Sequence, residues 1–289
     1  MQNIKYLISV IVIVVCFAAC DKYDIQGFFI SPSKERVNER FEQSIAYNEQ
    51  HKNDTLISTT QEDYRFYVAS DVHVKTTAEH LALFIDIAST DEKSLYSAIL
   101  GDITDQKHGL QIAYDTIENH KTNSIIRTVA GNHDIYFDQW AEYYSLFGSS
   151  TYYFVVQTPT ANDLFIALDS SSGTLGKKQM EWLKQILKEK RSQHRHCIVM
   201  THTHFFDRDM SQFPTGNFSI EETAMLTDLF TRNNVNLVIS GHDHTNENLI
   251  FNNVTYLVLD DIQDLDHEPT YFIVDVTNEN VSFERKLLK

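Results

Sequence analysis

Cysteine is scarce in this chain, with three in 289 residues. Two of them, Cys16 and Cys20, lie in an apolar segment near the N-terminus, so Cys197 is alone in the rest of the sequence. A disulfide framework is therefore excluded. Because Cys197 begins the apolar run Cys-Ile-Val-Met, we expect it to be a small buried residue rather than a nucleophile.

Basic residues are also fewer than acidic ones. The chain has 24 Lys and Arg against 40 Asp and Glu, which gives a formal net charge of −16. Duplex nucleic acid is disfavoured as a partner, because phosphate binding needs clustered basic side chains. Single nucleotides stay open. An apolar content of 42% with 22% charged residues is ordinary for a globular protein with a sizeable core.

No apolar run is as long as the roughly 20 residues that a membrane-spanning helix needs. The segment from Tyr6 to Ala19 is almost wholly apolar but ends abruptly at Cys20-Asp21-Lys22. Residues 1–19 are therefore predicted to be a signal peptide that is removed after export. Phe17-Ala18-Ala19-Cys20 resembles the processing box of bacterial lipoproteins, which implies a lipid on Cys20. The alternative is an ordinary signal peptide or an uncleaved anchor. Either way we expect the protein in the bacterial envelope, on the periplasmic side or the cell surface.

Residues 20–33 are mostly polar and are interpreted as a tether, and residues 34–289 as one domain that begins with a helix over 34–50. In that helix, Val37, Phe41 and Ile45 form one apolar stripe at helical spacing. Ser31 would cap it, with Pro32 in the first turn. We expect this helix to pack on the rest of the domain.

From Tyr64 onward, strand-like and helical patterns alternate, which predicts a layered α/β domain. The predicted strands are 64–70, 97–101, 124–129, 152–157, 163–169, 196–201, 235–240, 255–259 and 271–276. The predicted helices are 77–89, 110–121, 138–147, 176–190 and 220–233. The last strands have few helices between them, so hairpins and a partly antiparallel sheet are expected there.

Polar clusters rich in aspartate and histidine follow five of the predicted strands. They are Asp71-Val72-His73, Gly101-Asp102-Ile103-Thr104-Asp105, Gly131-Asn132-His133-Asp134, Thr201-His202-Thr203-His204 and Ser240-Gly241-His242-Asp243-His244. Ligand sites of α/β sheets form beyond the carboxyl ends of the strands, so we expect these clusters to converge.

Each cluster also has a purely structural interpretation. Asp71 could cap a helix, Asp102 could hold a turn with Gly101, and Asn132 could adopt a left-handed turn conformation. Five turns that supply Asp, Asn and His but almost no Ser, Lys or Arg are hard to explain in that way. Mixed carboxylate, amide and imidazole ligands suit metals such as Mn, Fe or Zn, so the clusters predict a metal site.

In this order, Asp-x-His, Gly-Asp-x-x-Asp, Gly-Asn-His-Asp, a strand-end His and Gly-His-x-His resemble the calcineurin-like metallophosphoesterase superfamily over residues 64–275. The resemblance implies a four-layer α/β/β/α sandwich, in which two mixed β-sheets are flanked by helices. It also implies two divalent or transition metal ions at the strand ends. The first would be bound by Asp71, His73, Asp102 and His244, and the second by Asp102, Asn132, His202 and His242.

The same resemblance implies a phosphoester hydrolase. Two metals about 3.5 to 4 Å apart lower the pKa of a shared water, and the bridging hydroxide attacks phosphorus in line. His133 would face the substrate, hydrogen-bonded to Asp105, and would protonate or stabilise the leaving alkoxide.

Two departures from the family pattern bear on the substrate. Gln106 follows Asp105 where the protein-phosphatase branch has an Arg, which argues against phosphoprotein substrates. His204 takes the place of a frequent Pro, and either contacts the substrate or is only a loop residue. Phe205, Phe206 and Phe213 could form an apolar wall near the metals or be buried packing.

The sequence thus favours an exported phosphodiesterase acting on a small or lipid-linked phosphate ester. A phosphomonoesterase or nucleotidase is the alternative, and hydrolysis of another bond such as an amide is a further enzymatic one. A lipoprotein that binds metal or phosphate without turnover is a third possibility.

Overall fold

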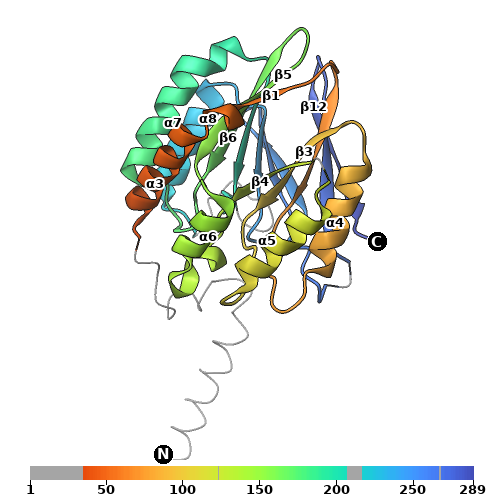
Figure 1. The fold of residues 1–289 in the computed structure, drawn as a ribbon. Coiled ribbons are helices and arrows are strands. Elements are labelled where there is room, and N and C mark those ends of the chain that lie inside the picture. Colours follow the sequence, from red (N-terminus) through yellow and green to blue (C-terminus); the bar gives the residue numbers. More distant parts are fainter. Residues whose placement is uncertain (1–34, 123, 207–216, 267) are drawn as a thin grey trace, which may run out of the picture.

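The computed structural model describes residues 35–122, 124–206, 217–266 and 268–289. The predicted signal peptide, tether and Ser31 cap lie outside these residues and stay predictions. Figure 1 shows two β-sheets between helices. Within the described residues, no helix is both long and apolar enough to span a membrane.

The smaller sheet has five strands in the order β12-β11-β2-β3-β4. Strands β2, β3 and β4 are parallel, and the hairpin of β11 and β12 adds antiparallel to β2. The bounds are Tyr64–Ala69 for β2, Ser94–Leu100 for β3, Ile125–Val129 for β4, Thr270–Val276 for β11 and Val281–Leu287 for β12.

The larger sheet has seven strands in the order β1-β5-β6-β7-β8-β10-β9. It is mostly parallel, with antiparallel pairs at β5–β6 and β9–β10. The bounds are Leu56–Ser58 for β1, Tyr152–Gln157 for β5, Asn162–Leu168 for β6, Cys197–Thr201 for β7, Leu237–Ser240 for β8, Glu247–Phe251 for β9 and Val254–Val258 for β10.

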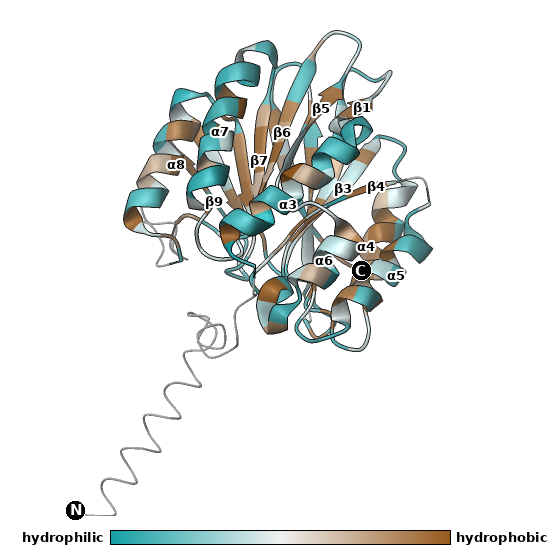
Figure 2. Cartoon of the chain, turned by 60° about the vertical axis from the view of Figure 1, so that its left-hand side comes forward, coloured by the Kyte–Doolittle hydropathy of each residue, from teal (hydrophilic) through white to brown (hydrophobic). Residues whose placement is uncertain are grey.

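Three apolar cores separate four layers. One core lies between the two sheets and includes Phe66 of β2 and Phe165 of β6, whose rings meet edge to face. A second joins the smaller sheet to α4 (Glu79–Thr90), α5 (Gly109–His120) and α6 (Trp140–Phe147). The third joins the larger sheet to α7 (Gly176–Lys190) and α8 (Ile220–Arg232). Figure 2 shows that α7 is mostly hydrophilic on the outside, while the strands beneath are apolar. The predicted α/β/β/α sandwich is confirmed.

The predicted hairpins near the C-terminus are present as β9–β10 and β11–β12. Strands β1, β9 and β12 were not predicted. The first has only three residues, and β9 and β12 alternate between exposed and half-buried positions, so neither carries a strong apolar signal. Two short 3-10 helices, Lys52–Thr55 and Arg191–Gln193, were not predicted either. Nor was a third 3-10 segment over His133–Asp138, which is kinked at Tyr136 and Phe137 and contains the His and Asp of the Gly-Asn-His-Asp motif.

The predicted N-terminal helix is α3, which begins at Val37 rather than residue 34 and ends at Gln50. It lies beside α7 (Figure 1), where Phe41 meets the ring of Trp182. Cys197 is buried at the start of β7, and burial raises the pKa of its thiol to about 12. The thiol is therefore neutral at physiological pH, in agreement with the predicted packing role.

Candidate metal centre

The five polar clusters follow β2, β3, β4, β7 and β8, and the structure brings their side chains together. Among the described residues, three groups of Asp and His place ligand atoms within 4.8 Å of one another. They are Asp71 with His73 and His244, Asp102 with His202 and His242, and Asp105 with His73 and His133. The expected convergence at the carboxyl ends of the strands is thus present.

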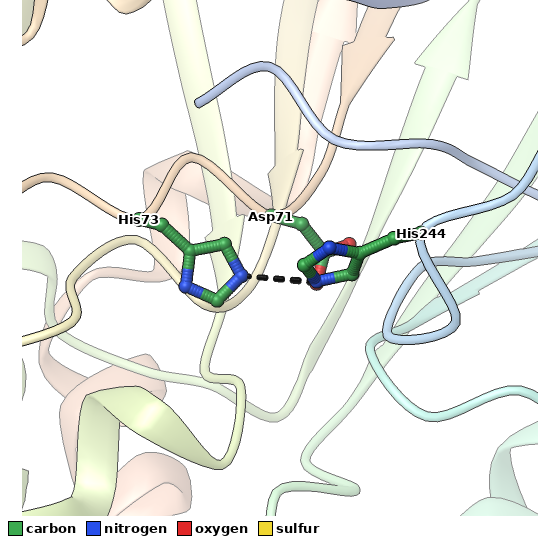
Figure 3. Close-up of side chains that lie close together, drawn as sticks. All are labelled: Asp71, His73 and His244. Atoms are coloured by element: carbon green, nitrogen blue, oxygen red, sulfur yellow. Dashed lines mark hydrogen bonds and ion pairs between the residues drawn. The ribbon is translucent and has the colours of Figure 1, made fainter. Parts of the chain in front are cut away.

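The first group lies between the ends of β2 and β8 (Figure 3). Nε2 of His73 is 3.1 Å from Nε2 of His244, and these two atoms are 3.8 and 3.4 Å from Oδ1 of Asp71. A metal with bonds of about 2.0–2.1 Å would hold tetrahedral ligand atoms about 3.3–3.4 Å apart, which these separations approach. Oδ1 of Asp71 is buried and accepts no hydrogen bond within the described part of the chain. The group therefore fits a metal ion.

The second group is more deeply buried. Nε2 of His202 lies 3.0 Å from Oδ1 of Asn132, 3.2 Å from Nδ1 of His242 and 3.3 Å from Oδ2 of Asp102. These separations also match the ligand spacing of a metal with bonds of about 2 Å. Three atoms of suitable chemistry therefore lie within 3.3 Å of Nε2 of His202, and their binding of one common ion stays a prediction.

Three of the four predicted histidine ligands are oriented by a contact at their outer ring nitrogen, which is the nitrogen that faces away from the ligand group. Nδ1 of His202 donates to the carbonyl oxygen of Leu100 at 2.8 Å, and Nδ1 of His73 and of His244 face carboxylates. In a neutral imidazole this leaves Nε2 unprotonated and directed into the group. The tautomers are those that metal binding requires.

Asp102 lies in the second group, and burial, which would raise the pKa of its carboxyl, is outweighed by the charges of His202 and His133 and by a smaller contribution from His73 of the first group. Asp102 also contacts His133. Nε2 of His133 is 3.9 Å from Oδ2 of Asp102, and the backbone N–H of His133 donates to Oδ1 of Asp102 at 2.8 Å. The bridging role of Asp102 and the assignment of ligands to each ion stay predictions.

Asp105 contacts two imidazoles rather than the one that was predicted. Its Oδ1 lies 3.0 Å from Nδ1 of His133 and 2.6 Å from Nδ1 of His73, and its Oδ2 pairs with Nζ of Lys75 at 3.1 Å. Burial would raise the pKa of the Asp105 carboxyl, but hydrogen bonds from His133 and His73 outweigh it and lower the pKa. One ionised carboxylate therefore orients both a predicted ligand and the predicted acid.

Two further carboxylates support the site and were missed in the sequence. Asp261, just beyond β10, lies 3.2 Å from Nδ1 of His244. Asp134 accepts backbone hydrogen bonds from Ile103, Thr104 and Gly131, which ties two ligand loops together. Burial raises the pKa of Asp134 to about 7. Asp134 stands in the Gly-Asn-His-Asp motif, which was a usable signal, whereas nothing in the sequence marks Asp261.

The electrostatics of the cluster favour cations. Burial would raise the pKa of Asp71 and Asp102, but neighbouring histidines outweigh it and lower both. Burial lowers the pKa of His244, yet the carboxylates of Asp261 and Asp71 outweigh burial and raise the pKa to about 11. For His202, burial is outweighed by the charge of Asp102, and the pKa rises to about 9. In the absence of metal, His244 and His202 are therefore protonated at neutral pH, and these protons supply the positive charge that metal ions would supply.

His242 behaves differently from its neighbours. Burial and the charge of His202 lower its pKa to about 3, so it is neutral and ready to coordinate at physiological pH. Its backbone N–H donates to Oδ2 of Asp71 at 2.9 Å, which links the loop after β8 to the loop after β2. The motif thus contacts both groups.

The backbone of these loops is bent sharply. Left-handed φ angles occur at five predicted ligands: Asp71 (54°), His73 (51°), Asp102 (48°), His242 (76°) and His244 (50°). Non-glycine residues rarely adopt this conformation, and such strain is concentrated at functional sites. A Cβ on Gly241 would lie 1.9 Å from Oγ of Ser70 and 2.3 Å from Oδ2 of Asp71, so only glycine permits this close approach.

His204 is buried, with its ring centroid 5.6 Å from that of His242, and its role as a substrate contact stays a prediction. Phe205 and Phe206 are core residues. Phe205 stacks on Phe218 at 5.3 Å, and Phe206 meets Tyr256 at 4.9 Å. The packing alternative therefore holds for these two, and Phe213 lies outside the described residues.

Comparison with known proteins gives the same fold. A dimetal phosphatase of Danio rerio superposes with a TM-score of 0.59 at 13% identity, over 78% of this chain and 96% of that one. The inner membrane complex anchor GAP50 of Plasmodium gives 0.57 at 16% identity, over 79% and 86%. A purple acid phosphatase of yellow lupin gives 0.58 at 13% identity, over 78% of this chain and 52% of that one.

No curated protein matches the chain in sequence. The sequence model of the calcineurin-like phosphoesterases, however, matches residues 64–246, which is more than half of the chain and includes all five motifs. The chain therefore belongs to the calcineurin-like phosphoesterase family, whose members are metal-dependent phosphoesterases.

Proposed function

We propose that the protein hydrolyses a small or lipid-linked phosphate ester outside the cytoplasm, with phosphodiesters favoured. One observation carries the catalytic part of the proposal. Nε2 of His133 lies 3.9 Å from the carboxylate of Asp102, while Nδ1 of the same ring is held by Asp105 at 3.0 Å. A proton donor is thus fixed next to the predicted metal ligands, within reach of a substrate oxygen bound there.

Two bound ions would supply an activated water and neutralise phosphoryl oxygens. The chain's own residues then have separate tasks. Asp105 fixes the His133 ring through Nδ1, which leaves Nε2 to carry the proton that the leaving alkoxide needs. Burial of Asp102 and His202 keeps bulk water away from the second ligand group, which strengthens its interaction with charge.

The distribution of cations supports the diester preference. Among the described residues, Lys75 is the one Lys or Arg that pairs with a predicted site residue, and its partner is Asp105. Gln106, in place of the Arg of protein phosphatases, donates to the carbonyl of Lys75. A phosphate monoester carries about −1.5 to −2 charge at pH 7, which needs more positive charge than a singly charged diester does.

Parallel assays with added Mn²⁺ test the proposal. Bis-p-nitrophenyl phosphate should be turned over faster than p-nitrophenyl phosphate, and His133→Ala should reduce the rate while metal stays bound. Faster monoester turnover, or phosphate release from a nucleoside monophosphate, would establish the monoesterase or nucleotidase alternative. No turnover of any of these esters by the metal-loaded chain would favour the binding protein instead.

Export and lipidation form a separate part of the proposal. They rest on the apolar segment from Tyr6 to Ala19 and on the small residues before Cys20. Mass spectrometry of the membrane fraction should find a mature chain that begins with an acylated Cys20. A soluble chain with a free N-terminus at that residue would contradict the lipoprotein assignment, without affecting the metal centre.

A further inference from the structure

Helix α3 lies outside the family match at residues 64–246, yet it contains a fully buried charge. Arg40 is 1% exposed, and its Nε donates to Oδ2 of Asp169 at 2.9 Å. Its Nη2 donates to Oδ1 of Asp169 at 3.3 Å and to the hydroxyls of Ser171 and Ser172 at 3.0 and 2.9 Å. The guanidinium thus holds the segment that follows β6 by four hydrogen bonds.

That segment in turn supports a predicted metal ligand. Ser170, next to Asp169, accepts hydrogen bonds at its Oγ from the backbone N–H groups of His202 (3.2 Å) and Thr203 (2.8 Å). Its carbonyl oxygen accepts from the hydroxyl of Thr203 at 3.0 Å. Arg40 therefore acts on the backbone of the second ligand group through two adjacent residues.

A second path from the same helix leads to the other side of that group. Oγ of Ser44, which is fully buried, accepts from the backbone N–H of Ser150 at 3.3 Å. Oγ of Ser150 accepts from the backbone N–H of Ala130 at 2.8 Å, two residues before Asn132. Both paths end at ligands of the second predicted ion. Within the described chain, no hydrogen bond joins α3 to Asp71, His73 or His244.

We propose that α3 positions the ligands of the second metal ion, with Arg40 and Ser44 as positioning residues that act on His202 and Asn132. The inference rests on the two-metal centre of the proposed function. Residues that orient metal ligands tune affinity by about 10–100-fold. The selectivity follows from geometry, because the first group is held from elsewhere, by Asp105 and Asp261.

Metal binding to the metal-stripped full chain tests the inference without any substrate. Titration calorimetry with Mn²⁺ should show two binding steps in the wild type. His242→Ala, which lacks a ligand of the second ion, and His244→Ala, which lacks one of the first, assign the steps. Arg40→Lys keeps the charge but loses the forked geometry, and is expected to weaken the second step about tenfold or more with the first unchanged.

Two more variants separate positioning from general loosening of the fold. Ser44→Ala removes one hydrogen bond and leaves the buried ion pair of Arg40 in place, so it keeps the test available if an Arg40 variant does not fold, and it should weaken the same step by less. Glu42→Ala is the matched control. Its side chain on the same helix is half exposed and pairs with Nζ of Lys178 in α7, which belongs to none of the ligand loops, so both steps should stay as in the wild type.

The outcomes are distinct. Two ions bound with unchanged affinity in Arg40→Lys and Ser44→Ala would overturn the inference and leave the two-metal centre intact. An equal loss at both steps, or the same loss in Glu42→Ala, would also overturn it, since the effect would then be one of overall stability. A wild-type chain that binds one ion would refute the two-metal centre itself.

Discussion

The two halves of the metal centre differ in what orients their ligands. In the first group, the outer nitrogens of His73 and His244 face the carboxylates of Asp105 and Asp261, and the His244 side chain is 37% exposed. In the second, the outer nitrogen of His202 donates to the Leu100 carbonyl, and the His202 side chain is fully buried. One half is polarised by charge near solvent, and the other is held by the backbone inside the fold.

This difference has chemical consequences. A carboxylate behind an imidazole makes the ring a stronger base and metal ligand, but also increases its affinity for protons. The pKa of His244, about 11, accordingly exceeds that of His202, about 9. We expect the first ion to be sensitive to charge changes and acid, and the second to changes in packing and backbone position.

The largest expected effect comes from the residue predicted to serve both ions. Asp102→Asn should remove negative charge from the centre. The loss of phosphodiesterase activity should exceed the roughly 100-fold that is typical of changing a residue that only hydrogen-bonds to a ligand. Metal analysis of the purified variant should find fewer than two ions per chain. Full metal content with wild-type activity would show that Asp102 is no bridge.

His133→Ala should reduce turnover by roughly a hundredfold or more, because the proton donor is lost. Metal content should stay at the wild-type level, since His133 is not a predicted ligand. This variant separates chemistry from metal binding in a way that no ligand variant can. Unchanged turnover, or loss of metal, would refute the assigned role.

The pH dependence should distinguish the two halves. Each ion must displace the proton of a histidine whose pKa is raised, so affinity should rise with pH by about tenfold per unit for each proton displaced. The pKa of His202 is about 9, so the affinity for the second ion should stop rising with pH near pH 9. The pKa of His244 is higher, so the affinity for the first ion should continue to rise beyond that pH. Calorimetry from pH 6 upward measures both slopes, and equal slopes throughout would contradict the comparison.

The smallest effect is expected for Asp261→Asn. The amide keeps an acceptor for Nδ1 of His244 but removes the negative charge, so the first ion should bind about tenfold more weakly. Affinity for the second ion should not change. Asp264→Asn is a suitable control, because Asp264 is another carboxylate of the same loop but contacts Thr77 and His80 instead. A loss at the second step would show that the halves are not separately oriented.

Much of this architecture is encoded locally. The alternation of strand and helix patterns predicted the layered fold, and the polar clusters at strand ends predicted convergence, because both depend on residues close in sequence. The buried ion pair of Arg40 with Asp169 joins residues 129 positions apart, and no local pattern marks either partner. Its existence depends on how α3 docks.

The same limit applies to the residues behind the ligands. Asp261 follows an ordinary apolar strand, and only the fold places it beside His244. Asp105 was assigned to His133 by resemblance, and its shorter contact with His73 became visible only in three dimensions. The motifs identify the ligand residues, whereas contacts between residues far apart in the sequence determine how the ligands are oriented.

The most direct test of the two-metal centre is anomalous diffraction from crystals of the Mn²⁺-loaded protein. Two peaks about 3.5–4 Å apart are expected, one beside Asp71, His73 and His244 and the other beside Asn132, His202 and His242, with Asp102 between them. A single peak, or His242 and His244 on the same ion, would contradict the account.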